Sequence, residues 1–468
     1  MWTIIARKEL KEAIRKRVFL VLALVFWALM GVTAYSSYGQ YTHYTGQVKE
    51  AEHMFRQEWE EQKRNPHSAA HFGTYLFKPL SYLGLYDPGI NSYTGNTYRV
   101  EAHNQSEINY AAAHDNDVQQ RFGLLTIGLV FQLLMPLLVI FLCAPSITVE
   151  REHRILQVLV AQGLHRRELL KGKIAGNYAL VLLITIPALL IMLVAVMLRE
   201  NQLAGRFLLF GAAYLIYFFV ITLVGTFISA ISKTSSQALF RGLGFWVLFA
   251  VLIPRAAAMI AGEAERLPSR YEFNRKVDKA FDDGIDGDPD YITRRKNFEK
   301  ETLKKYKVDM VTALPFNFDG LSIQNGEDYL TWVYLKLSRE QEQIINRQQR
   351  AQEWFGLLSP FVSIQQLSMG ISGTDYVHHV DFHHHAQRYR DQFIRVLNMD
   401  MANSKSAYLS YDYEVGPEFF KKMKRFNYVW PDAGWALRQH LISGGILLAW
   451  LLLLLCSINP VSKHIAYD

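Results

Sequence analysis

Five histidines gather within a short stretch of the chain: His378, His379, His383, His384 and His385. On a helix, His379 and His383 are four residues apart and share one face, as do Asp381 and His385. Imidazole nitrogens at this spacing are suitable ligands for Zn²⁺ or Cu²⁺. The alternative is a polar helix face whose histidines form hydrogen bonds or contact water. Because neither a cysteine nor a second ligand segment accompanies the cluster, we predict no metal site here.

Motifs for enzymatic chemistry are absent from the sequence. The pair Gly172-Lys173 is followed by Ile174 and lacks the earlier glycine of a phosphate-binding loop. Glu152-His153 lacks the second histidine of a zinc protease motif, and no Gly-x-Ser-x-Gly segment offers a serine nucleophile. We therefore predict that the chain is not an enzyme, does not hydrolyse ATP and binds no cofactor itself.

The composition indicates a membrane protein. Hydrophobic residues make up 50% of the 468 residues, yet the mean hydropathy is only +0.02, as expected when apolar and polar blocks alternate. Cys143 and Cys456 both lie in apolar runs, which excludes a disulfide framework for the polar blocks. The basic residues behind the net charge of +7 are scattered beside apolar segments. We therefore expect a lipid bilayer as a partner, and no nucleic acid.

Six apolar runs are long enough to cross a bilayer, which takes about 20 residues. The first run follows a basic head and lacks a cleavage site behind a compact apolar core, so we interpret it as an uncleaved anchor. The predicted spans are residues 18–38, 122–144, 174–198, 207–231, 243–261 and 436–456.

Lysine and arginine near the ends of the spans predict the orientation, because they stay on the cytoplasmic side. This rule places residues 1–17, 145–173, 232–242 and 457–468 in the cytoplasm. The insertions 39–121 and 262–435 then lie outside, where apolar residues at near-helical spacing favour helices. We predict a mainly α fold: a six-helix transmembrane domain with an N-terminal interfacial helix, plus a mixed, mostly helical extracytoplasmic module built from both insertions.

The cytoplasmic loop 145–173 carries an ordered series of features. These are Glu150, Arg151 and Glu152 after the second span, then Ile155, Leu156 and Leu159 in an apolar helix, a turn at Gly163, and Gly172-Lys173 before the third span. The series resembles permease subunits of type-2 ABC transporters, and the stretch Ile5–Glu12, with Glu9, is similar to their interfacial helix. The resemblance implies that the loop helix docks in a cleft of a separate ABC ATPase, which carries ATP and Mg²⁺. The alternative is an ordinary solvated loop.

A second resemblance lies in the large insertion. Ser359–Phe382 and the pair Pro254-Arg255 resemble a subgroup of these permeases whose large insertions have an uncharacterised function. This resemblance implies a bacterial inner-membrane protein with cytoplasmic termini and periplasmic insertions. It also implies a homodimer, or a heterodimer with a related permease. The transporter would either export a substrate or act mechanically on a periplasmic protein partner.

Arg255 is a charged residue within the predicted fifth span. By default its aliphatic stem carries the guanidinium to the membrane interface. The alternative is contact with an anionic substrate or a partner carboxylate, because charge inside a membrane is costly and often functional. We therefore keep Arg255 as a candidate substrate or partner contact.

A rival function requires no ATPase. In this hypothesis the outside segments bind a ligand or a metal, and the spans only anchor a sensor protein in the membrane. The two hypotheses differ at the loop helix, whose Glu150 and Arg151 matter for ATPase association only in a transporter.

Overall fold

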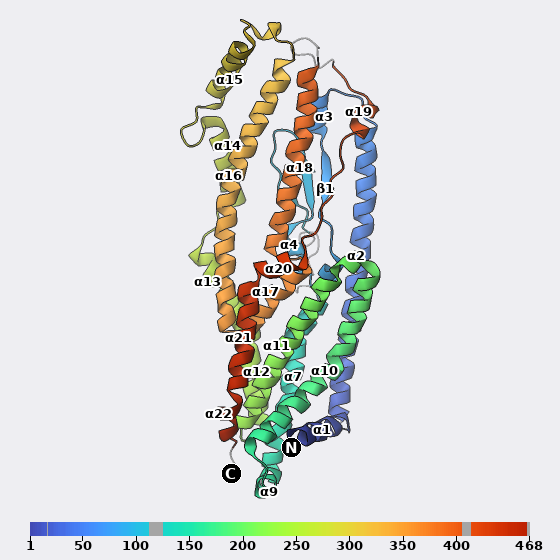
Figure 1. The fold of residues 1–468 in the computed structure, drawn as a ribbon, viewed down its shortest axis with the longest axis vertical. Helices are drawn as coiled ribbons and strands as arrows, with labels where there is room; N and C mark the ends of the chain where they lie inside the picture. The colour runs from blue at the N-terminus through green and yellow to red at the C-terminus, as the bar shows by residue number, and fades with distance from the viewer. Residues whose placement is uncertain (16, 112–124, 405–412, 466–468) are drawn as a thin grey trace.

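The computed structural model describes residues 1–15, 17–111, 125–404 and 413–465. The predicted segments 1–17, 39–121, 122–144, 262–435 and 457–468 therefore lie partly outside the described residues. The described chain is elongated, with the N-terminus and helices α9 (Ile155–Ala161) and α22 (Ile458–Lys463) at one end, which we call the proximal end (Figure 1). The other end, with α15 (Tyr291–Tyr306) and α19 (Pro417–Lys421), is the distal end.

Within the described residues, six helices are long and apolar enough to cross a membrane. They cover Arg17–Glu60, Ile127–Glu152, Arg166–Arg199, Asn201–Ile231, Ser235–Ala264 and Leu441–Lys463. In this order they contain α2 (Arg17–Glu60); α6 (Ile127–Leu129), η3 (Val130–Leu134), α7 (Met135–Cys143) and α8 (Pro145–Glu152); α10 (Arg166–Arg199); η4 (Asn201–Leu203) and α11 (Ala204–Ile231); α12 (Ser235–Trp246), η5 (Val247–Leu252) and α13 (Ile253–Ala264); and α21 (Leu441–Cys456) with α22. The predicted mainly α fold with six membrane-capable helices is confirmed.

Two of these helices widen into a π-helical turn just before a proline. The turn η3 precedes Pro136, and the turn η5 precedes Pro254. A proline inside a helix has no N–H to donate, and its ring clashes with the carbonyl four residues earlier. The wider turn relieves this clash while the helix continues.

Helix α11 lies at the centre of the apolar bundle and packs against α7, α10, α21 and α17 (Pro360–Ser372). Close approach to α7 depends on Gly225, because an added Cβ there would lie 2.9 Å from the Cβ of Cys143. Phe131 packs edge-on against Tyr214 and Phe218, with ring centroids 5.1 and 5.7 Å apart. The bundle core therefore combines a small-residue contact with interlocking aromatic rings.

Helix α2 runs without a break for 44 residues, about 66 Å at 1.5 Å per residue. The hydrocarbon core of a bilayer is only about 30 Å thick, so roughly half of the helix projects beyond it. The sequence predicts a first span that ends at residue 38 and a separate insertion from residue 39. The helix continues because residues 17–60 contain no proline, and the polar residues after Tyr38 are compatible with helix.

The distal module consists of the distal half of α2 with the described residues 61–111 and 265–440. Its first part contains α3 (Pro66–Phe72), β1 (Thr74–Phe77), η1 (Tyr82–Leu85), α4 (Asn91–Thr94), β2 (Thr97–Val100) and β3 (Ile108–Asn109). Its second part contains α14 (Arg270–Asp283), α15, η6 (Val311–Ala313), α16 (Phe318–Trp354), η7 (Phe355–Leu357), α17, α18 (Tyr376–Asn403), α19 and α20 (Ala433–Gln439). The strands form an antiparallel sheet in the order β1-β2-β3, with Leu76 opposite Tyr98 and Tyr98 opposite Ile108.

Both parts of the distal module contribute to one core. Trp59 of α2 is 1% exposed, and its ring lies 4.6 Å from that of Phe393 in α18 and 5.2 Å from that of Phe420 in α19. Tyr98 and Leu76 of the sheet are buried in the same cluster. Residues more than 300 positions apart in the sequence therefore pack together, and the end of α2 is held inside the module.

Buried polar side chains join the distal module to the apolar bundle. The Gln132 side chain in η3 donates hydrogen bonds to Asp87 at 3.0 Å and to the Tyr214 hydroxyl at 2.9 Å. Tyr214 donates in turn to Ser368 of α17 at 2.8 Å, and Ser368 donates to Asp87. Because each buried polar group here finds a partner, the network fixes how the module is oriented on the helices.

We expect Trp59→Ala to lower the stability of the protein by about 3 to 5 kcal/mol, because it removes a fully buried aromatic side chain. The measurement is the thermal unfolding midpoint in detergent. Trp354→Ala is the matched control, because Trp354 is 55% exposed. Equal shifts for the two variants would contradict the assignment of Trp59 to the core.

Candidate functional site

Helix α1 (Trp2–Arg15) lies against the first turns of α10 at the proximal end (Figure 1). Two glycines of α10 allow this contact. A Cβ added at Gly172 would lie 2.5 Å from the Cβ of Ile5, and one added at Gly176 would lie 2.6 Å from the Cβ of Glu9. The absence of side chains at the two glycines therefore brings the helix backbones close together.

Lys173 is the charge at the centre of the proximal end. Its side chain is 2% exposed, and its ammonium lies 2.5 Å from Glu9 of α1 and 2.8 Å from Glu150 of α8. Lys8 adds a second cation 3.4 Å from Glu150. A buried charge is tolerated only when paired and hydrogen-bonded. The pairing therefore ties together α1, α8 and α10, which come from three separate parts of the sequence.

The last residues of α8 contact two other helix ends. The Arg151 guanidinium donates hydrogen bonds to the carbonyl oxygens of Ser232 and Ala230, the latter at 2.9 Å, where α11 ends. Glu152 accepts hydrogen bonds from the backbone N–H and the hydroxyl of Ser235, at 2.8 and 2.9 Å, where α12 begins. A cation at a helix C-terminus and an anion at a helix N-terminus both match the helix dipole and satisfy unpaired backbone groups.

Helix α9 projects beyond the rest of the protein at the proximal end (Figure 1). A left-handed residue, Arg154 with φ 60°, separates it from α8, and Gly163 with φ 88° follows it. Leu156 is 1% exposed, and Leu159 is half-buried. Ile155 and Val158, by contrast, are 42% and 56% exposed. The helix thus anchors one apolar side chain inward and presents two others outward.

Comparison with known proteins identifies the family. A sequence model described as ABC-2 family transporter protein matches residues 3–381, which include all of α1 except its first residue and the whole α8–α10 region. The chain belongs to the ABC-2 transporter family. No curated protein matches the chain.

Membership in the ABC-2 family makes the chain a transmembrane permease of an ABC transporter. With its membrane-capable helices, it is a multi-pass membrane protein. The family also implies an ABC ATPase as partner. The structure brings Glu9 and Glu150 together through Lys173 and places Arg151 and Glu152 at the ends of neighbouring helices. Roles in coupling for these residues and for Ile155, Leu156, Leu159 and Gly163 stay predictions.

Sequence reasoning named Gly172-Lys173 only as a basic lead into the third span and did not identify Lys173 as the shared partner of both carboxylates. The available signal was a lysine directly before an apolar run, preceded by two acidic segments. That signal does not reveal which acidic residues approach the lysine, because their positions depend on how α1 and α8 pack.

Arg255 lies on α13, apart from the contacts among α1, α8 and α10. Its side chain is exposed, and it makes no hydrogen bond or ion pair with any other residue that the structure describes. Its role as a substrate or partner contact stays a prediction.

The histidines 378–385 do not converge on one point. His378 is buried, with Nδ1 bonded to Asp375 and Nε2 accepting from Arg206 at 2.6 Å. Nε2 of His384 lies 2.7 Å from Glu342, and Nδ1 of His385 lies 2.8 Å from the carbonyl oxygen of Asp381. Arg206 lies on α11 and Glu342 on α16, so His378 and His384 connect α18 to two other helices.

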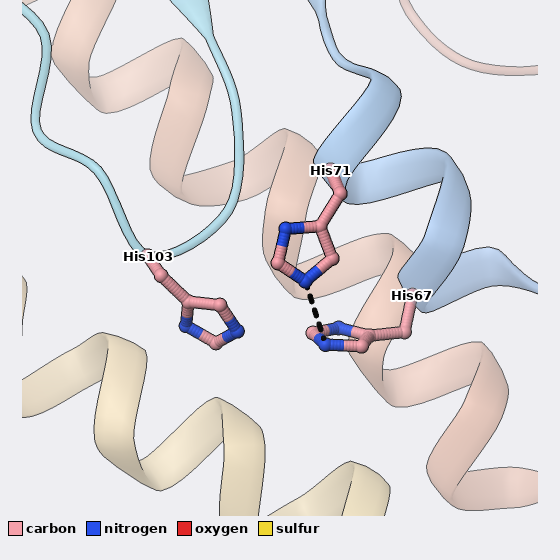
Figure 2. A group of neighbouring side chains, drawn as sticks. All are labelled: His67, His71 and His103. Atoms are coloured by element: carbon pink, nitrogen blue, oxygen red, sulfur yellow. Dashed lines mark hydrogen bonds between the residues drawn. The ribbon is translucent and has the colours of Figure 1, made fainter.

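A different group of histidines does converge. His67 and His71 on α3 and His103 in the loop after β2 face one another (Figure 2). Sequence reasoning passed over this group. The spacing of His67 and His71 by four residues was a visible signal, whereas His103 approaches them only in the folded chain.

We expect Lys173→Met to destabilise the proximal end by about 3 kcal/mol, because it removes the ammonium shared by Glu9 and the buried Glu150. The measurements are the thermal unfolding midpoint and the rate of limited proteolysis within α1. Lys171→Met is the matched control, since Lys171 forms no ion pair with any described residue. If both variants behaved alike, the buried pairing would not hold α1 in place.

Proposed function

We propose that this permease converts ATP-driven closure of a separate ABC ATPase into movement of its membrane helices. The proposal rests on the position of α9 and on which of its apolar side chains are exposed. It projects at the proximal end with Ile155 and Val158 exposed, while Leu156 is buried. An apolar helix face of this kind fits a groove on a protein partner.

The contacts around α8 supply a route for the motion. A push on α9 is passed to α8, whose Glu150 is paired with Lys173 of α10 and, through it, with Glu9 of α1. Arg151 and Glu152 carry the same push to the ends of α11 and α12. In this proposal four membrane-capable helices receive the motion through charged contacts of defined geometry.

The proposed orientation places the proximal end in the cytoplasm. ATP and Mg²⁺ are then bound by the ATPase, and the permease carries no nucleotide site of its own. Lys8, Arg15, Arg166 and Arg167 lie at this end, as expected for cytoplasmic segments of a bacterial inner-membrane protein. The distal module is then periplasmic.

Two outputs are compatible with this mechanism. The first is export of a substrate along the helices, with Arg255 as a candidate contact. The second is mechanical action of the distal module on a periplasmic protein partner. The continuity of α2 from the bundle into the module favours the second output, because tilting one rigid helix moves both parts.

We also propose that the permease pairs with a second copy or with a related permease. The helix Ser235–Ala264 supports this, since its most apolar window is only 11% buried within the chain. A partner permease or lipid covers this surface in the membrane.

The test is co-purification of the tagged chain from its native membrane, with mass identification of partners and an ATPase assay. We expect the parent chain to recover a P-loop ATPase. Ile155→Asp and Val158→Asp should each lower this recovery at least tenfold, because a carboxylate placed in an apolar contact is strongly disfavoured.

Ile292→Asp is the matched control, since Ile292 is 62% exposed and lies on α15 of the distal module. It should leave ATPase recovery unchanged. The thermal unfolding midpoints of all variants should agree within a few degrees, because each substituted side chain is exposed. Recovery of the parent chain without any ATPase in mild detergent would instead support the anchored ligand- or metal-binding sensor.

A further inference from the structure

Three histidines of the distal module lie in a triangle. The ring centroids of His67 and His71 are 4.7 Å apart, and that of His103 lies 5.2 and 5.1 Å from them (Figure 2). One ligand nitrogen from each residue can be chosen so that all three lie within 4.8 Å of one another. The rings therefore surround a common point without filling it.

The spacing of the first two ligands already matches a tetrahedral ion. Nε2 of His67 lies 3.2 Å from Nε2 of His71. In a tetrahedral zinc site with Zn–N distances of about 2.05 Å, neighbouring nitrogens are about 3.3 Å apart. His103 has a side chain that is 48% exposed, and its ring centroid lies 5.1 Å from that of His71.

The outer ring nitrogens have partners that orient two of the ligands. Nδ1 of His67 lies 3.3 Å from the side-chain oxygen of Asn398, which directs Nε2 inward. Nδ1 of His103 lies 2.8 Å from Glu327, and Glu327 is paired at 2.6 Å with the buried Arg390. Amide and carboxylate partners behind histidine ligands fix the ring orientation in metal sites and increase ligand basicity.

The protonation state of the group also favours metal binding. Burial lowers the pKa of His67 to about 4, and the neighbouring histidines act in the same direction. Burial and His103 likewise lower the pKa of His71. Neutral imidazoles are the form that binds a metal. Burial alone would raise the pKa of Glu327, but the hydrogen bond from His103 and the charge of Arg390 lower it to about 2.

The backbone at His103 is unusual as well. Its φ of 57° is in the left-handed region, which non-glycine residues rarely occupy. Glu327 accepts the backbone N–H of His103 at 2.6 Å and so holds this conformation. The buried carboxylate of Glu327 therefore holds His103 in a fixed position beside His67 and His71.

We propose that His67, His71 and His103 form a site for a divalent transition-metal ion of the Zn²⁺ class, with a fourth position open to water. Three imidazoles with an open position are an established coordination pattern for zinc. The exposure of His71 and His103 leaves the site accessible from solvent. This proposal is independent of the ATPase and departs from the sequence-based expectation that the chain binds no metal.

The ion would fasten separate elements of the distal module to one another. His67 and His71 belong to α3, and His103 belongs to the loop after β2. Through Glu327 and Asn398 the site also adjoins α16 and α18. Metal binding to the folded state alone stabilises that state, so the module should unfold at a higher temperature with the ion bound.

The experiment measures Zn²⁺ binding to the full-length protein in detergent, purified through a tag without histidines. After treatment with a chelator, we expect titration with Zn²⁺ to saturate at one ion per chain and to raise the unfolding midpoint. Co²⁺ should give the intense visible absorption of a tetrahedral complex. His71→Ala and His103→Ala should each weaken Zn²⁺ binding by more than about a hundredfold.

Both side chains are exposed, and Glu327 keeps its ion pair with Arg390 when His103 is replaced, so the metal-free variants should unfold within a few degrees of the metal-free parent. His384→Ala is the matched control from the other histidine cluster and should bind Zn²⁺ like the parent. Absence of stoichiometric binding to the parent would overturn the proposal. Binding that survives in both His71→Ala and His103→Ala, or that is lost in His384→Ala, would overturn it as well.

Discussion

The proximal end of this permease depends on one buried ammonium group. Lys173 has almost no contact with solvent, so its charge requires both Glu9 and Glu150 close by. These carboxylates belong to the N-terminal helix and to the end of the second membrane-capable helix. The requirement to neutralise a single charge therefore holds α1 and α8 against α10. Glycines 172 and 176 are needed for the same reason, because the carboxylate of Glu9 reaches Lys173 only if the backbones approach closely.

Buried charged and polar groups also join the distal module to the membrane-capable helices. Asp375 caps α18 and contacts His378 on the same helix, and it lies 2.7 Å from Nε2 of His440 at the start of α21. His378 accepts a hydrogen bond from Arg206 near the start of α11. The segment that resembles the permease subgroup thus contains the charges that join the insertion to two membrane-capable helices. Of its two histidines, His378 belongs to this junction, whereas His67, His71 and His103 form a separate group within the distal module.

The parts of the fold that follow from local pattern could be predicted from the sequence. Apolar runs identify membrane-capable helices because hydropathy depends on neighbouring residues alone, and the order of features in Glu150–Gly163 indicated the ABC-2 family. Three features could not be predicted. The continuation of α2 to Glu60 has no local signal, since a polar extension of a helix looks the same as a separate amphipathic helix. The role of Lys173 and the approach of His103 to His67 both depend on tertiary packing. Lys173 lies 164 positions from Glu9 in the sequence, and His103 lies 36 positions from His67, so no local pattern indicates either contact.

The proposed coupling contacts around Lys173 and the proposed metal site lie near opposite ends of helix α2. Helix α2 follows α1, which the Lys173 pairing holds, and ends at Trp59 and Glu60 inside the distal core. Helix α3, with His67 and His71, begins only six residues after Glu60. Movement of α2 can act on a partner only if the distal module attached to its end is rigid, because a flexible module would deform instead of moving. In the proposed mechanism, an ion that joins α3 to the loop after β2, beside α16 and α18, would stiffen the module at the point where α2 delivers its movement.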